Sequence, residues 1–177
     1  MSSPSMSDIK ITTKELLQLS LICALMFICK EAMNALPNIH PVMLFIILTG
    51  IVYGWKALLP VFGFSLLEIA VFGLGMWSIV YLYIWPLALC LVMAFRNNRS
   101  ALVWSVLAAA FGLCFGMLSA IPYIFVSGFK GAAAYWIAGI PFDLLHAAGN
   151  FVITLVLYPV LLPVFIGFKD GSIFLSK

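Results

Sequence analysis

The chain has 177 residues, of which 65% are hydrophobic and only 8% are charged. About a quarter of the residues in an ordinary soluble domain are charged, so this composition excludes a soluble globular protein and predicts an integral membrane protein. The net charge of +3 is small and comes from the gaps between apolar runs, so it does not predict nucleic-acid binding.

The apolar runs predict an all-α integral membrane protein, a compact bundle of six transmembrane helices. Residues 1–15 form a polar N-terminal segment, residues 16–168 the six-helix membrane domain, and residues 169–177 a cytoplasmic tail. The N-terminal segment lacks the apolar stretch and the cleavage site of a signal peptide. No internal repeat divides the chain, so we expect one domain.

Six candidate spans follow in chain order, at about residues 16–36, 41–53, 57–74, 79–95, 101–126 and 135–168. The second is short, because a bilayer crossing needs about 20 residues. It must tilt, lie off-centre or be sheltered by its neighbours. The last contains Pro141, Pro159 and Pro163 and follows residues 132–140, which we expect to be an external loop or a half-helix. Gly54-Trp55-Lys56 predicts a tight turn.

Basic residues alternate between the gaps. Seven of the nine precede the first span, lie in the second or fourth gap, or follow the last span: Lys10, Lys14, Lys56, Arg96, Arg99, Lys169 and Lys177. Because basic loops stay in the cytoplasm, this pattern predicts that both termini are cytoplasmic. The remaining two, Lys30 and Lys130, lie in gaps assigned to the outside.

With that topology, nearly all polar side chains of the apolar runs fall in the outer half of the bundle. They are Glu31, Asn34, Asn38, His40, Glu68, Trp77, Tyr81, Tyr83, Tyr123, Tyr135, Trp136, Asp143, His146 and Asn150. Each is unfavourable in hydrocarbon unless it is paired or faces a cavity. The asymmetry predicts capture of a molecule from the outer side.

Asp143, His146 and Asn150 share one helix face, because their spacings are three and four residues. One interpretation is a ligand-binding polar stripe. The other is structural: Asp143 caps a helix that begins after Ile140-Pro141, and the other two bond neighbouring helices. No paired-histidine spacing is present, so we expect no metal site.

Other polar residues leave two interpretations open. Lys30 and Glu31 point about 100° apart on a helix, so we expect no direct pair between them. Lys30 then anchors at the interface, and Glu31 pairs with Lys130 or faces the cavity. Glu68 is either a ligand contact or a structural hydrogen-bond partner. The Trp and Tyr residues are typical of an interfacial belt, or else line a cavity for a flat, partly aromatic ligand.

Small residues mark two helix faces. Ser20 and Ala24 lie four apart in the first span, a spacing that allows close approach of another membrane helix. Ala108, Gly112 and Gly116 form a longer small stripe in the fifth span, which we expect to allow close packing within the bundle.

The chain resembles the substrate-binding S components of energy-coupling factor (ECF) transporters over almost its whole length. The resemblance rests on the length, the six spans, Ser20-xxx-Ala24 in place of an AxxxA-type signature, and two consecutive stretches. These are residues 36–42, LPNIHPV, and residues 45–54, FIILTGIVYG. Ser20 in place of Ala departs from the pattern and keeps a small residue.

The resemblance implies a high-affinity binding subunit for a vitamin in a bacterial plasma membrane. The first helix, through Ser20 and Ala24, would dock onto a transmembrane coupling subunit, which two cytoplasmic ATPase subunits drive. The implied site holds Asn34, Asn38, His40, Trp77, Tyr81, Tyr123, Asp143, His146 and Asn150. The aromatic outer segments resemble members proposed for cobalamin, with a pyridoxine- or pyrimidine-type compound as the alternative. The vitamin is the substrate, no cofactor is covalently bound, and only the partners use ATP, because the chain has no GxxxxGK[ST] loop.

Two other classes compete with a binding subunit. A small secondary carrier or channel needs a polar path to the cytoplasm, whereas the inner halves of these spans are almost purely apolar. An intramembrane enzyme could use Asp143 and His146 as an acid–base pair, but no nucleophile or paired carboxylate accompanies them. We therefore expect that the protein is not an enzyme.

Overall fold

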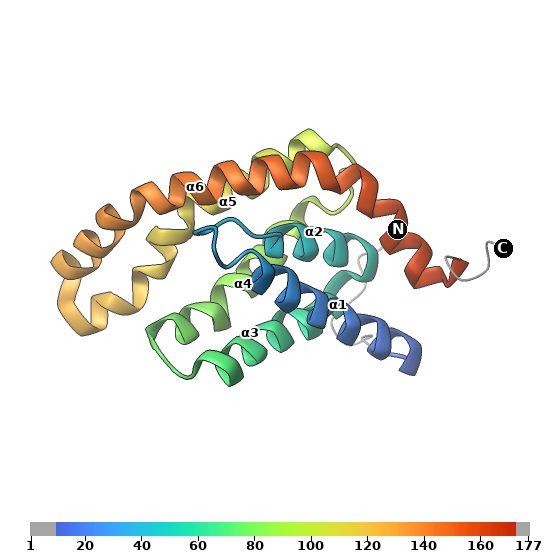
Figure 1. Ribbon diagram of the computed structural model, residues 1–177, viewed down its shortest axis with the longest axis horizontal. Coiled ribbons are helices and arrows are strands. Elements are labelled where there is room, and N and C mark those ends of the chain that lie inside the picture. Colours follow the sequence, from blue (N-terminus) through green and yellow to red (C-terminus); the bar gives the residue numbers. More distant parts are fainter. Residues whose placement is uncertain (1–9, 173–177) are drawn as a thin grey trace.

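The computed structural model describes residues 10–172, which form helices joined by short turns and contain no strand (Figure 1). In chain order these are α1 (Thr13–Ala32), α2 (Val42–Tyr53), the short 3-10 helix η2 (Gly54–Ala57), α3 (Leu58–Phe72), α4 (Met76–Phe95), α5 (Ala101–Ser119) and α6 (Ile121–Asp170). The all-α prediction is confirmed for this part of the chain.

Four segments of the described chain are long and apolar enough to cross a membrane. They are Val42–Phe72, Met76–Phe95, Ala101–Ser119 and Ile121–Asp170. The predicted count of six spanning helices is not supported by this criterion, because α1 is not among the four and α2, η2 and α3 form one continuous apolar segment. A membrane protein remains the class that these helices fit.

Helix α1 begins at Thr13 because Thr12 and Glu15 form reciprocal hydrogen bonds at its N-terminus. The Thr12 hydroxyl accepts a hydrogen bond from the Glu15 N–H, and the Glu15 carboxylate accepts one from the Thr12 N–H. Such a capping box satisfies backbone donors that a helix start otherwise leaves free. The polar segment predicted over residues 1–15 is therefore helical from Thr13, and residues 1–9 lie outside the described part.

Helix α2 forms the centre of the molecule. Eleven of its twelve residues are buried, including Ile46, Ile47 and Leu48. A helix that is apolar on every side needs neighbours all round, and α2 packs against α1, α4, α5 and α6. We expected this short helix to be tilted, off-centre or sheltered by its neighbours, and in the structure it is sheltered by its neighbours.

The chain reverses direction at η2, where Gly54 adopts φ 64°. Glu15 pairs with Lys56 beside the start of α3, and Lys30 reaches Glu68 near its end, so α1 and α3 run in parallel. The Tyr53 hydroxyl at the end of α2 donates to Gln18 near the start of α1, so α2 runs the opposite way. The predicted tight turn is confirmed.

The α5–α6 hairpin departs from prediction. α5 ends at Ser119 rather than near residue 126, and α6 follows at once, interrupted only by Gly128 with φ 70° and ψ 180°. Residues 132–140, expected as an external loop or a half-helix, are continuous with the rest of α6. α6 thus comprises two helical pieces, residues 121–127 and 129–170. The second piece is about 63 Å long if straight, against about 30 Å of hydrocarbon, and it follows the whole length of the molecule (Figure 1).

Backbone contact joins α5 to α6. A Cβ on Gly112 would lie 2.9 Å from the Ala147 nitrogen and 3.0 Å from the His146 carbonyl carbon. Only glycine allows the two backbones to approach so closely. The small stripe of α5 therefore serves packing within the bundle, as predicted, and α6 keeps its helical path through Pro141 while held against α5.

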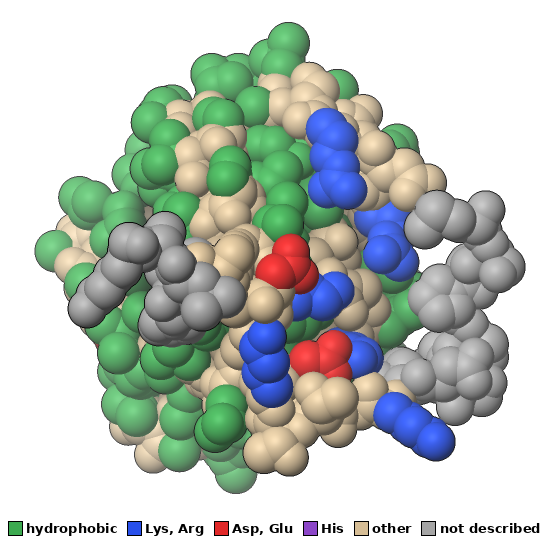
Figure 2. Space-filling view, turned by 90° about the vertical axis from the view of Figure 1, so that its right-hand side faces the viewer, with side chains coloured by type: hydrophobic (Ala, Val, Ile, Leu, Met, Phe, Trp, Pro, Cys, Tyr) green, Lys and Arg blue, Asp and Glu red, His purple; other side chains and the backbone are tan. Residues whose placement is uncertain are grey.

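One end of the molecule is basic (Figure 2). We call it the basic end and define it by Lys14, Lys56, Arg96 and Lys169. Lys14 Nζ lies 3.2 Å from the Cβ position of Gly171, and Arg96 lies 3.5 Å from that of Gly54. Lys56 pairs with Glu15 at 2.6 Å, and Lys169 donates to the Val52 carbonyl at 2.7 Å.

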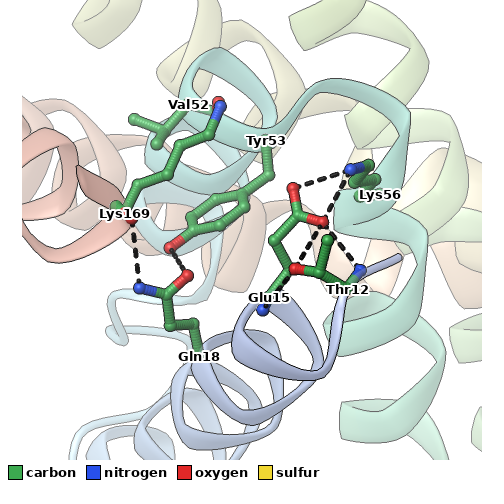
Figure 3. Close-up of polar contacts among 7 residues, drawn as sticks. All are labelled: Thr12, Glu15, Gln18, Val52, Tyr53, Lys56 and Lys169. Atoms are coloured by element: carbon green, nitrogen blue, oxygen red, sulfur yellow. Dashed lines mark hydrogen bonds and ion pairs between the residues drawn. The ribbon is translucent and has the colours of Figure 1, made fainter. Parts of the chain in front are cut away.

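Interhelical hydrogen bonds hold the basic end together (Figure 3). Gln18 is at their centre, because its amide donates to the Phe168 carbonyl at 2.5 Å and accepts from the Tyr53 hydroxyl at 3.3 Å. The start of α1, the end of α2 and the end of α6 therefore meet here, and Gln18, Tyr53, Lys56 and Lys169 have partners within the chain.

Candidate functional site

Two histidines and five aromatic residues gather at the end opposite the basic end. We call this the histidine–aromatic cluster, comprising His40, Phe64, Trp77, Tyr81, Trp85, Phe115 and His146. It joins the segment before α2 to α3, α4, α5 and α6. Residues that are far apart in the sequence are thus in contact in one cluster.

His146 is the most buried polar member of the cluster. Its side chain is 1% exposed, and neither ring nitrogen has a hydrogen-bond partner. Its ring meets His40 and Phe115 edge-on, at centroid distances of 5.2 and 4.8 Å. Buried polar atoms in native proteins are nearly always paired, so the two free nitrogens make His146 a candidate for contact with a bound group or an ordered water.

His40 lies between α1 and α2 and also has an unpartnered Nδ1. Burial and the nearby Lys30 ammonium lower the pKa of His40 to about 4. The imidazole is therefore neutral at physiological pH, where it offers one donor and one acceptor.

Asp143 lies one helical turn before His146 on the same face of α6. Its Oδ1 accepts the Gly116 N–H at 2.8 Å, and its buried Oδ2 has no partner. A Cβ on Gly116 would collide with the carboxylate. The structural interpretation of Asp143 as a helix cap is wrong, because α6 passes through this point unbroken.

Asn150 has a structural role in the same face. Its amide donates to the Ala108 carbonyl of α5 at 3.1 Å. The polar face continues beyond it to Thr154 and Tyr158, both buried and with unpartnered hydroxyls. We call Asp143, His146, Asn150, Thr154 and Tyr158 the α6 polar face. The prediction that the inner half is purely apolar overlooked its last two members.

Lys30 links two of the acidic residues of this end. Its ammonium contacts Glu31 at 2.8 Å and Glu68 at 2.7 Å, and it lies 5.1 Å from the centre of the Phe72 ring. The prediction that Lys30 and Glu31 form no pair is wrong, because a long lysine side chain spans the angle between neighbouring positions. Glu31 therefore pairs with Lys30 and not with Lys130, and Glu68 bonds another helix as one interpretation expected.

Three cavities open around these residues. The aspartate cavity, about 370 Å³, is lined by Asn38, Phe115, Gly116, Ser119, Tyr135, Ala138, Gly139, Phe142 and Asp143. The lysine cavity, about 300 Å³, is lined by Lys30, Asn34, Glu68, Phe72, Trp77 and Tyr81. The loop cavity, about 260 Å³, shares Lys30, Asn34 and Tyr81 with the second and Asn38 with the first. The shared residues place all three at one site.

Most of the predicted site residues come together here. Asn34, Asn38, His40, Trp77, Tyr81 and Asp143 line a cavity, and His146 lies in the cluster behind them. Tyr123 lines none of the three and stacks on Tyr135 at 4.2 Å, so it reaches the site only through that ring. Asn150 is occupied by its bond to α5.

The residues of the site that were not predicted include Phe64, Trp85, Phe115 and Ser119. Trp85 follows Trp77 and Tyr81 at four-residue intervals, so helical periodicity could have found it. Ser119 similarly continues the Gly112-Gly116 stripe by three residues. Phe115 had no distinguishing signal, because α5 and α6 are apolar throughout this region.

The predicted docking residues lie on an open surface of α1. Ser20 is exposed and Ala24 half-buried, and the neighbouring Leu17 and Leu21 are 68% and 51% exposed. Ser20 also borders a groove of about 430 Å³ between α1 and α3, where Gly63 allows Cys23 to approach closely.

No three His, Cys, Asp or Glu side chains of residues 10–172 lie close enough together to hold a metal ion. No protein-family model, no curated protein and no solved structure matches the chain. The functional interpretation therefore rests on the sequence and on the geometry of the site.

Proposed function

We propose that the protein is the substrate-binding subunit of an ECF-type importer, which captures a vitamin or related micronutrient at the outer face of a bacterial plasma membrane. One observation carries the proposal. His40 and Asp143 carry unpartnered, buried polar atoms and line cavities that share Asn38, and the unpartnered nitrogens of His146 lie beside His40, whereas Lys56 and Lys169 of the basic end have partners within the chain.

The proposal includes six passes with both termini in the cytoplasm. The basic end holds the start of α1 and the end of α6, joined by the Gln18–Phe168 bond. Cytoplasmic basic residues fit the positive-inside rule. The site then lies on the outer side, where a binding subunit meets its substrate.

Cavity size bears on which ligand fits. Drug-sized molecules fill cavities of roughly 300–1,000 Å³, and the three cavities measure about 370, 300 and 260 Å³. A corrinoid is several times larger than such a molecule. The cavities thus favour a pyridoxine- or pyrimidine-type compound over cobalamin as the captured vitamin.

Delivery would depend on a transmembrane coupling subunit and two ATPase subunits. The exposed face of α1 around Ser20 and Ala24 suits contact with another membrane helix. ATP would be hydrolysed by the partners only.

Mass spectrometry of the purified protein tests the proposal, because a high-affinity site retains its ligand. We expect one small molecule at near-equal stoichiometry, and single Asp143→Ala and His146→Ala changes to weaken its binding by about 1–3 kcal/mol each. Cys90→Ala, on an exposed face of α4, serves as the control. Unchanged affinity in both site variants would assign the polar face a structural role.

A secondary carrier is the second candidate, favoured by the extension of the α6 polar face to Thr154 and Tyr158. Proteoliposomes holding this chain alone separate the two. Ligand accumulation driven by an imposed proton gradient without ATPase partners supports the carrier, and dependence on the partners and ATP supports the binding subunit.

A further inference from the structure

Asp143 is a buried carboxylate for which residues 10–172 supply no cation. Its side chain is 4% exposed, and its one hydrogen bond comes from the Gly116 N–H. The ion pairs of residues 10–172 involve Glu15, Glu31 and Glu68, and none reaches Asp143. A buried charge is unfavourable without a partner of opposite charge, the more so at membrane depth.

In the neighbouring cavity, by contrast, the acidic groups have a cation within the chain. There, Lys30 lies between Glu31 and Glu68 and over the Phe72 ring. The lysine cavity thus contains its own cation. The aspartate cavity has no Lys or Arg in its lining, so a negative charge on Asp143 would need a cation from a bound molecule.

The rest of the aspartate cavity restricts the shape of that molecule. Phe115, Tyr135 and Phe142 supply apolar and aromatic walls. The buried Ser119 hydroxyl lines the same space and, like Asp143 Oδ2, has no partner. Aromatic walls suit a flat group, and two unpartnered oxygens suit a group that donates several N–H bonds.

We infer that the captured ligand carries a planar, nitrogen-containing cation, such as an amidinium or aminopyrimidinium group, and that Asp143 and Ser119 bind it. This inference rests on the proposed function, since it names the substrate class of the same site. Charged hydrogen bonds are the strongest available to Asp143, so the cation would be the main determinant of specificity at this subsite.

Three isosteric probes test the charge requirement: benzamidinium, benzamide and benzoate. Ligand-stripped protein in nanodiscs is titrated with each, and binding is followed by tryptophan fluorescence, because Trp85 lies beside Phe115 of the cavity. We expect benzamidinium to bind in the millimolar range or better, as suits a fragment of this size. We expect it to bind at least about tenfold tighter than benzamide, with benzoate weakest, a difference of about 1.4 kcal/mol.

Asp143→Asn keeps an oxygen for the Gly116 N–H and removes the charge. We expect it to reduce benzamidinium binding about tenfold and to leave benzamide binding unchanged. Glu15→Gln, the same chemical change at the basic end, should alter neither. The preference of the wild-type protein for benzamidinium is measured without any variant. The charge requirement can therefore be tested even if Asp143→Asn fails to fold.

The outcomes separate the inference from the proposed function. Equal binding of the three probes, preference for benzoate, or no binding of benzamidinium in the millimolar range would overturn the inference. A co-purified ligand without a cationic nitrogen group would also overturn the inference. It would not contradict the proposal that the protein is a binding subunit. A clear benzamidinium preference, in a protein that retains no natural ligand and transports with no ATPase partner, would overturn the proposed function alone.

Discussion

The site depends on single atoms, and Gly116 is the clearest case. Its missing side chain lets the Asp143 carboxylate reach the backbone N–H of α5. We expect Gly116→Ala to push the carboxylate away, lower the melting temperature in detergent, and weaken ligand retention. Overpacking of this kind typically costs about 1–3 kcal/mol.

Gly139→Ala is the matched control, because a Cβ there meets nothing within 4 Å. Both glycines line the aspartate cavity, so the comparison isolates the collision with Asp143. Equal stability of the two variants would mean that the carboxylate can move aside freely.

The residue scale also predicts a pH dependence at the basic end. Hydrogen bonds from the Lys56 ammonium and the Thr12 N–H hold the pKa of Glu15 at about 2, below its ordinary 4.5. Because the folded-state pKa is the lower one, Glu15 stabilises the fold fully above about pH 4.5, and this contribution is lost as the pH falls toward about 2.

We therefore expect Glu15→Gln to lower the melting temperature at pH 7, with the difference from wild type narrowing below about pH 4.5. The pair is partly exposed, so the difference at pH 7 should be small and should shrink in high salt. Melting curves of both proteins between pH 3 and 7 measure it. A difference that stays constant over that range would contradict the assignment.

At the scale of the element, the helical structure of residues 132–140 within α6 can be tested. Most side chains of residues 132–140 are exposed, although Ala132 is buried, and their amides belong to a continuous helix. We expect hydrogen–deuterium exchange in this stretch to be as slow as in residues 144–154, because exchange reports hydrogen bonding of the backbone. The turn at residues 73–75 should exchange fast. Fast exchange at 132–140 would restore the loop that the sequence predicted.

The sequence predicted that these helices form, but it did not predict where several of them end. Apolar runs located α1 to α5, because each run exceeds what a loop tolerates. Lys130 was placed in an outer gap and residues 132–140 were expected to form an external loop or a half-helix, whereas the chain needs only one non-helical residue, Gly128, between two helical pieces. Periodicity cannot distinguish a turn of one residue from a loop of nine.

The candidate site was predictable as a side of the molecule and less so as a set of contacts. The positions of Asp143 and His146 on one face follow from their spacing alone. The partners do not, because Lys30 meets Glu68 across 38 residues and Asn150 meets Ala108 across 42. Such pairings depend on how helices pack, which a single sequence does not encode locally.

At the scale of the whole molecule, the two ends have different chemistry. At the basic end, Lys56 pairs with Glu15, and Lys169 donates a hydrogen bond to the Val52 carbonyl. The other end leaves polar atoms of His40 and His146 free. This difference supports the proposal that the second end binds a molecule.

Helix α1 runs from the basic end to the other end, and its exposed face is the predicted docking surface. Ser20 and Ala24 are small and lie on the outer surface, away from the three cavities of the site. Replacing both by Trp should block close approach of a partner helix without disturbing the site. We expect loss of ligand uptake and of co-purification with the ATPase partners, with ligand affinity unchanged.

Leu102→Trp is the control, since Leu102 is 57% exposed on α5 and also faces outward. If bulk on any outer face impaired uptake, both variants would fail. Loss of uptake in Ser20→Trp/Ala24→Trp alone would locate docking on α1, because ligand binding and partner contact would then depend on different surfaces. Loss of ligand binding in that variant would instead show that α1 shapes the cavities through Lys30, and that capture and docking share one helix.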